Sequence, residues 1–187
     1  MIRAVFDACV LFPPSLRDLL LNLAWAKLVQ PYWSEEIHDE WMRSVLQNRP
    51  GVPSESLERT RRMMDAKFPR SLISGHAELV PNLELPDPND RHVLALAIHT
   101  KSPLIVTANL KDFPRTTLEP HGIEAVSPDE FVMRLAAKKP LGVLAAANKH
   151  RSNLHNPPKT AEEYIDSLRR QGLTKTVAFL EQHRSEI

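Results

Sequence analysis

Residues 85–90 read Leu-Pro-Asp-Pro-Asn-Asp, and a mostly apolar run, RHVLALAI, follows directly at 91–98. Pro88 suits the first position of a helix, which places Asp87 at the N-cap and Asp90 at the third helical position. Carboxylates at these positions satisfy free backbone N–H groups and complement the helix dipole without doing any chemistry. The stretch therefore predicts the start of a helix, with capping as the alternative to a functional role for Asp90.

Strands and helices alternate along the chain on either side of this helix. Apolar runs predict strands at 2–6, 29–33, 79–80, 104–106 and 122–126. Residues spaced for one helix face, or strong helix starts, predict helices at 15–24, 34–47, 54–68, 91–100 and 128–138. Such alternation implies a parallel sheet covered on both faces. We therefore expect an α/β fold with three layers, α/β/α, around a central parallel sheet.

The chain changes character after residue 140. Residues 141–147 favour a helix, residues 153–159 form a linker rich in Pro and Asn, and the sequence TAEE at 160–163 matches a capping box. A last helix is expected at 173–183. We interpret residues 138–187 as a small helical appendage to a domain formed by residues 1–137. The appendage holds nine Lys or Arg and five Asp or Glu, a balance compatible with nucleic acid but common in other proteins.

Composition narrows the class of protein. With 187 residues, 42% of them hydrophobic and 25% charged, the chain has the make-up of a soluble globular protein. It has no run of 18 apolar residues, and Asp7 comes too early for a signal peptide. The one cysteine excludes an internal disulfide and fits a reducing, cytoplasmic location. A Gly-rich phosphate loop, a GxSxG elbow and the His/Cys spacing of a zinc site are all absent.

The predicted helix at 34–47 carries several acids, of which one is expected near the core. Glu40 borders the apolar stripe of this helix, whereas Asp39 has Arg43 one turn further on, a pair typical of a solvated face. The three tryptophans, Trp25, Trp33 and Trp41, are interpreted as core residues rather than as platforms for stacking nucleic-acid bases.

Acidic side chains are also predicted to gather at one edge of the sheet. Asp7 follows the first strand, the polar loop at 107–112 follows the strand at 104–106, and Asp90 opens a helix. Sites in parallel sheets form outside the carboxyl ends of the strands, so these acids can converge without being close in sequence. Clustered carboxylates repel one another unless a cation binds among them, and oxygen ligands favour Mg²⁺ or Mn²⁺ over zinc.

Four segments together resemble a PIN domain over roughly residues 1–137. They are FDACVL at 6–11, WSEEI at 33–37 with Glu40-Trp41, Asp87 through Asp90 with VLA at 93–95, and TANLKDF at 107–113. Within this family the chain is most similar to the VapC-like toxins of bacterial toxin–antitoxin pairs, including a subgroup with a helical C-terminal extension. The resemblance implies a metal-dependent ribonuclease acting on single-stranded RNA, neutralised by a cognate antitoxin and often forming a homodimer.

The resemblance also implies roles for individual residues. The family's four metal-binding acids match Asp7, Glu40, Asp90 and Asp112, with Thr107 and Asn109 as polar supports and Asp87 at the extra acidic place of some members. Cys9 stands where many relatives carry Asn or Ser, a departure that could weaken a hydrogen bond to the site. Whether Asn109 or Asp112 lies closer to the metal is left open.

These observations lead to one expected activity and two alternatives. We expect hydrolysis of RNA phosphodiester bonds by metal-activated water, leaving a 5′-phosphate and a 3′-hydroxyl. One alternative is a PIN-fold module that binds RNA or protein without cutting, and the other is a metal-dependent phosphatase for small esters. Basic residues of the appendage either follow the RNA backbone or form a solvated helix end: Lys138, Lys139, Lys149, His150 and Arg151.

Overall fold

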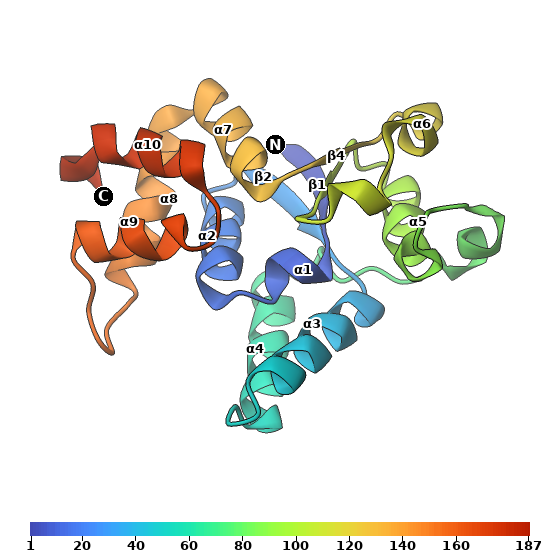
Figure 1. Ribbon diagram of the computed structural model, residues 1–187, viewed down its shortest axis with the longest axis horizontal. Coiled ribbons are helices and arrows are strands. Elements are labelled where there is room, and N and C mark those ends of the chain that lie inside the picture. The colour runs from blue at the N-terminus through green and yellow to red at the C-terminus, as the bar shows by residue number, and fades with distance from the viewer. The chain divides into compact units, whose positions relative to one another are not determined.

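The computed structural model describes residues 1–187, and its strands form one four-stranded sheet in the order β2-β1-β3-β4 (Figure 1). The strands are β1 (Ile2–Phe6), β2 (Val29–Tyr32), β3 (Leu104–Val106) and β4 (Glu124–Val126). β1 pairs with β3 and β3 pairs with β4, both in parallel, with Phe6 opposite Val106 and Val106 opposite Val126. Strands β1, β3 and β4 therefore end at the same level, which confirms the expected α/β fold with a parallel sheet.

Contacts along the chain define two compact units. The sheet unit comprises Arg3–Phe12 and Pro31–Val126, and the helical unit comprises Met1–Ile2, Pro13–Gln30 and Ser127–Ile187. The expected helical C-terminal region is confirmed, and it shares its unit with an early helix of the chain. The predicted boundary between residues 137 and 138 stays a prediction.

The sheet unit surrounds its strands with helices and short 3-10 turns. Its helices are α1 (Ala8–Leu11), α3 (Glu35–Asn48), α4 (Ser54–Lys67), α5 (Arg91–His99) and α6 (Arg115–Leu118), and its 3-10 helices are η1 (Ala77–Asn82), η2 (Pro88–Asp90), η3 (Leu110–Asp112) and η4 (Glu119–His121). The predicted strand at 79–80 is wrong, because these residues lie in η1. Pro81 inside this segment has no N–H to donate to a sheet ladder, which disfavours a strand there.

The helical unit consists of α2 (Pro14–Trp25), α7 (Pro128–Lys138), α8 (Pro140–Ser152), α9 (Ala161–Arg169), α10 (Thr174–Gln182) and the 3-10 turn η5 (Arg184–Glu186). The capping box at the start of α9 is confirmed: Thr160 Oγ1 accepts from the Glu163 N–H at 3.2 Å, and Glu163 Oε2 accepts from the Thr160 N–H at 2.9 Å. Asp129 of α7 holds the start of α10 by accepting from the N–H groups of Lys175 and Thr176. None of the helices is both long and apolar enough to cross a membrane.

Two expectations for the helical unit are corrected. Trp25 is 60% exposed and is not a core residue, because it ends α2 outside the buried leucine stripe of that helix. His150 is buried, and its Nδ1 lies 3.1 Å from the Tyr164 hydroxyl. Burial lowers the pKa of His150 to about 4, so this neutral, enclosed ring does not offer a charge to an RNA backbone.

A buried polar network joins α3 to α4 in the sheet unit. Asp65 Oδ1 accepts from Trp33 Nε1 at 2.9 Å and lies 3.1 Å from His38 Nε2. The indole N–H of Trp41 donates to His38 Nδ1 at 2.9 Å, so the proton of the neutral imidazole is on Nε2, which donates to Asp65. Burial lowers the pKa of His38 despite the nearby Asp65, in agreement with this neutral form. Trp33 and Trp41 are therefore core residues, as expected.

The exposed side of α3 pairs differently from the sequence-based expectation. Asp39 does not pair with Arg43; its Oδ1 lies 3.5 Å from Arg61 Nη1 on α4, and Arg61 also contacts Glu35. The acids on the exposed side of α3 therefore form ion pairs with Arg61 of α4. Asp39 does not use the basic residue one turn further along its own helix.

Asp65→Ala should destabilise the sheet unit by about 1–3 kcal/mol, because it leaves the buried N–H groups of Trp33 and His38 without an acceptor. Urea unfolding followed by tryptophan fluorescence measures this change. The matched control is Asp39→Ala on the exposed side of α3, which should stay within about 0.5 kcal/mol of the wild type. Equal stability of the two variants would contradict the role assigned to the network.

Candidate functional site

Asp7 occupies the end of β1, where the carboxyl ends of the paired strands coincide. Its N–H donates to the Val106 carbonyl at 3.1 Å, and the residue is 6% exposed. Although Asp7 precedes α1, its carboxylate makes no capping hydrogen bond. Oδ2 instead accepts from Thr107 Oγ1 at 2.7 Å and from Cys9 Sγ at 3.0 Å, and Oδ1 accepts no hydrogen bond from the chain.

Cys9 supplies a hydrogen bond that the sequence alone did not reveal. Its Sγ donates to Asp7 and accepts from the Ala108 N–H at 3.2 Å. Burial, followed by the charge of Asp7, raises the pKa of the thiol to about 12. The side chain therefore stays protonated at neutral pH and remains a donor to Asp7, in the place where many PIN domains carry Asn or Ser.

Glu40 contacts His92, a residue that the sequence analysis did not predict to be part of the site. Glu40 Oε1 on α3 lies 2.9 Å from Nε2 of His92 on α5, and Glu40 Oε2 accepts no hydrogen bond from the chain. Burial alone would lower the pKa of His92, but the hydrogen bond and the charge of Glu40 outweigh it and raise the pKa. The only sequence signal for His92 is its position two residues after Asp90, in the first turn of a helix.

The two acids of the 85–90 stretch have different environments. Asp87 Oδ1 accepts from the Asn89 N–H at 2.9 Å, so Asp87 caps η2 with Pro88 next to it, as predicted. Asp90 precedes α5 but makes no capping hydrogen bond. Its carboxylate accepts no hydrogen bond and forms no ion pair within the chain. Asp90 therefore does not cap the helix through a side-chain hydrogen bond.

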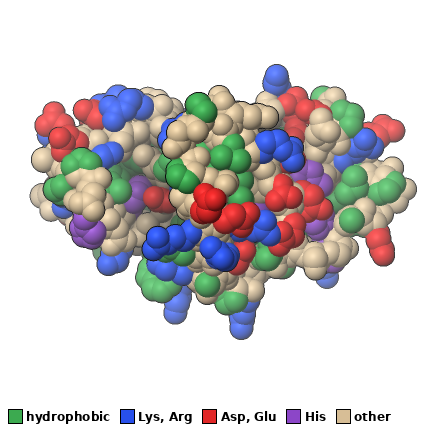
Figure 2. Space-filling model, turned by 90° about the horizontal axis from the view of Figure 1, so that it is seen from below, with side chains coloured by type: hydrophobic (Ala, Val, Ile, Leu, Met, Phe, Trp, Pro, Cys, Tyr) green, Lys and Arg blue, Asp and Glu red, His purple; other side chains and the backbone are tan.

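The electrostatics of Asp90 show that the acids converge. Its pKa is raised to about 7, first by burial and then by the negative charges of Asp7, Asp87, Asp112 and Glu40. The four acids that raise it come from separate segments of the sheet unit. Figure 2 shows red acidic side chains gathered beside purple histidine side chains on the face seen from below.

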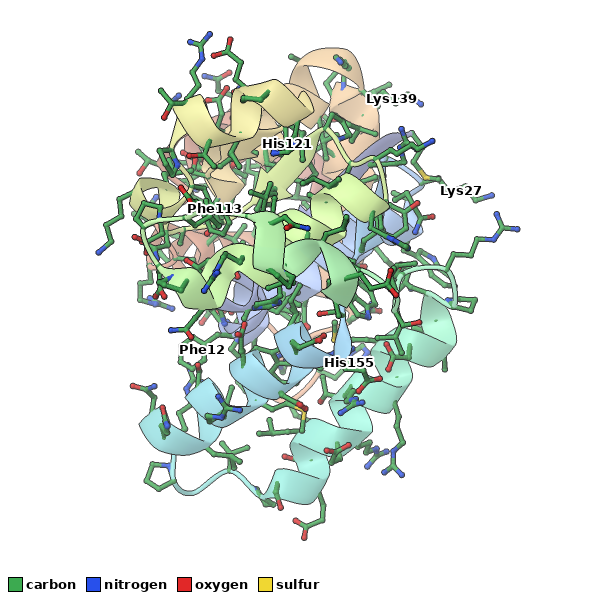
Figure 3. The ribbon with its side chains drawn as sticks, turned by 90° about the vertical axis from the view of Figure 1, so that its right-hand side faces the viewer. Phe12, Lys27, Phe113, His121, Lys139 and His155 are labelled. Atoms are coloured by element: carbon green, nitrogen blue, oxygen red, sulfur yellow. The ribbon has the colours of Figure 1, made fainter.

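The loop after β3 brings the last acid into place. Thr107 Oγ1 accepts from the Asn109 N–H at 3.0 Å, and the Asn109 side chain donates to Asp112 Oδ2. Phe113, labelled in Figure 3, is 3% exposed and anchors the end of the loop in the core. Asn109 thus contacts Asp112 directly, and Asp112 Oδ1 accepts no hydrogen bond from the chain.

Three of the four acids share one arrangement. Asp7, Glu40 and Asp112 each have one oxygen held by a donor of the chain and the other oxygen free. With the side chains as they stand, no three His, Cys, Asp or Glu residues form a ligand set around one point. The chemistry of the donors nevertheless fits a hard divalent cation, because it consists of carboxylate oxygens whose mutual repulsion a cation would relieve.

Comparisons with known proteins identify two families that match different parts of the chain. The family described as "PIN domain" matches residues 3–111, and the family described as "VapC50 C-terminal domain" matches residues 128–182. The curated protein "Putative ribonuclease VapC50" from Mycobacterium tuberculosis (strain ATCC 25618 / H37Rv) is 50% identical over 44 residues. These residues are 24% of this chain and 26% of the relative, so the match spans about a quarter of that protein's length. No solved structure matches the chain.

Asp90→Asn should stabilise the cation-free protein above pH 7. A carboxyl group whose pKa is higher in the folded chain stabilises the fold below its unfolded pKa, and this contribution is lost as the pH rises to the folded value. For Asp90 the window runs from the ordinary 3.8 to about 7. Thermal unfolding in a chelator should give the variant a higher melting temperature above this window and an unchanged one below it.

The control for this measurement is Asp39→Asn, which removes an exposed acid of α3 and should not change the pH profile. A lower melting temperature of Asp90→Asn above pH 7 would contradict the unfavourable electrostatics assigned to Asp90.

Proposed function

Because this chain belongs to the PIN-domain family and carries a VapC50-type C-terminal region, we propose that it is an endoribonuclease that depends on Mg²⁺ or Mn²⁺. The observation that carries the proposal is the gathering of carboxylates around Asp90, whose pKa is raised first by burial and then by the charges of four other acids. A chain gains nothing in stability from such mutual repulsion, whereas a cation-dependent site requires it.

The proposal assigns the cation to Asp7, Glu40, Asp90 and Asp112. Each of these acids has at least one oxygen that accepts no hydrogen bond from the chain, so an oxygen ligand is available from every one. A divalent cation held there would lower the pKa of water and neutralise charge on a phosphodiester. Asp87 is left with the structural role of capping η2.

The other residues of the site hold the acids in place. Thr107 and Cys9 fix one oxygen of Asp7, and Asn109 fixes one oxygen of Asp112. Asp90 has no such donor, and we assign to it the orientation of the attacking water. Attack on the phosphorus with departure of the 3′-oxygen leaves a 5′-phosphate on one product and a 3′-hydroxyl on the other.

Asp7→Asn should reduce RNA cleavage by at least about 100-fold, or about 2.7 kcal/mol in the activation free energy. The amide keeps the shape of the side chain but removes the charge that the cation needs. Cleavage of a single-stranded RNA in Mg²⁺ or Mn²⁺, with the product ends analysed, measures the effect, and circular dichroism checks the fold. Asp39→Asn is the control that should cleave like the wild type. Full activity of Asp7→Asn would overturn the proposal.

The alternative of a module that binds RNA or protein without cutting is disfavoured by the same acids. A retired site has no physical reason to keep a carboxylate whose pKa is raised to about 7 by burial and by the negative charges of its neighbours. Calorimetry with Mn²⁺ separates the two functions, because a binding module has no need of the cation and an enzyme of this kind does.

We further propose that the protein is the toxin of a VapBC-like toxin–antitoxin pair, since its C-terminal region matches a domain named after VapC50. Co-expression with the product of any small open reading frame found next to the gene tests this. A stable complex in which RNA cleavage is suppressed is the expected result. Separate migration of the two proteins with undiminished cleavage would contradict the assignment.

A further inference from the structure

We propose that His92 is a positioning residue that holds Glu40 in the orientation required for cation binding. The proposal rests on the function proposed above and adds to it a residue that the family resemblance did not assign. Its basis is the contact between His92 Nε2 and Glu40 Oε1, which are 2.9 Å apart. The His92 side chain is 12% exposed and the Glu40 side chain is 34% exposed, so the histidine is the more enclosed partner.

The hydrogen bond joins two helices at the point where the acids meet. Glu40 lies on α3 and His92 lies in the first turn of α5, which begins directly after Asp90. By holding Glu40 against the start of α5, His92 ties the position of Glu40 to the position of Asp90. The contact therefore opposes the mutual repulsion of Glu40 and Asp90, which would otherwise move these two carboxylates apart.

The imidazole of His92 makes its hydrogen bond through one nitrogen. His92 Nδ1 is buried and has no hydrogen-bond partner. Nε2 must carry a proton for the ring to donate to the carboxylate. The hydrogen bond of the ring therefore goes to Glu40.

Three other histidines of this chain are buried, and none of them bonds to one of the four acids. His38 bonds through both nitrogens, to Asp65 and to Trp41, and His150 bonds to the Tyr164 hydroxyl. Neither ring nitrogen of His76 has a hydrogen-bond partner. His92 differs from all three because its hydrogen bond goes to an acid of the site.

The hydrogen bond from His92 also leaves one oxygen of Glu40 available to a cation. His92 occupies Oε1 of Glu40 and leaves Oε2 without a partner from the chain. Thr107 and Cys9 treat Asp7 in the same way, since both donate to Oδ2 and leave Oδ1 free. A carboxylate held through one oxygen presents the other in a fixed direction, which is how outer partners of metal ligands tune affinity.

The test measures Mn²⁺ affinity of the full chain by calorimetry, with the fold of each variant checked by circular dichroism. His92→Phe keeps a ring but removes the donor, and it should weaken Mn²⁺ binding about 10–100-fold. His92→Gln places an amide N–H near the position of Nε2 and should restore most of the affinity. His99→Gln changes an exposed histidine on the same helix α5 and should bind like the wild type.

A double variant shows whether His92 acts through Glu40. Glu40→Gln combined with His92→Phe should bind Mn²⁺ no more weakly than Glu40→Gln alone, because the histidine then has no carboxylate to position. Wild-type affinity in a folded His92→Phe variant, or equal losses in His92→Phe and His92→Gln, would overturn the positioning role. Absence of Mn²⁺ binding by the wild type would instead overturn both this role and the proposed function.

Discussion

Mutual repulsion of carboxylates at one end of the sheet is the constraint on which the site depends. Asp7 is placed there by the end of β1, and the negative charges around Asp90, together with burial, raise its pKa to about 7. The rest of the site consists of donors that hold the other acids: Thr107, Cys9, His92 and Asn109. Each donor fixes one oxygen and leaves one free, so the repulsion remains and would favour the binding of a cation.

The polar network between α3 and α4 and the group of acids at the end of the sheet differ in their hydrogen bonding. In the network between α3 and α4, Asp65 accepts two hydrogen bonds, and the neutral His38 uses both of its nitrogens. Such a satisfied network stabilises a core. At the end of the sheet, the Asp90 carboxylate accepts no hydrogen bond and His92 Nδ1 has no partner. The two clusters therefore differ in how far their hydrogen bonds are satisfied, although both contain acids and histidines.

Local signals made much of this structure predictable from sequence, and tertiary contacts account for the rest. The cap by Asp87 and the capping box at Thr160 depend on residues three apart or closer, so the sequence specifies them directly. The hydrogen bond between Glu40 and His92 joins residues 52 positions apart, and no local pattern reports it. The exposure of Trp25 was missed because it depends on where α2 ends rather than on hydrophobicity.

The central claim is that the four acids bind one class of ligand, a hard divalent cation. Anomalous diffraction from crystals of the full chain grown with Mn²⁺ tests it most directly, since it locates the metal independently of any activity. An anomalous peak is expected at coordination distance from Asp7, with further ligands among Glu40, Asp90 and Asp112. A well-ordered structure in saturating Mn²⁺ with no peak at these carboxylates would contradict the account.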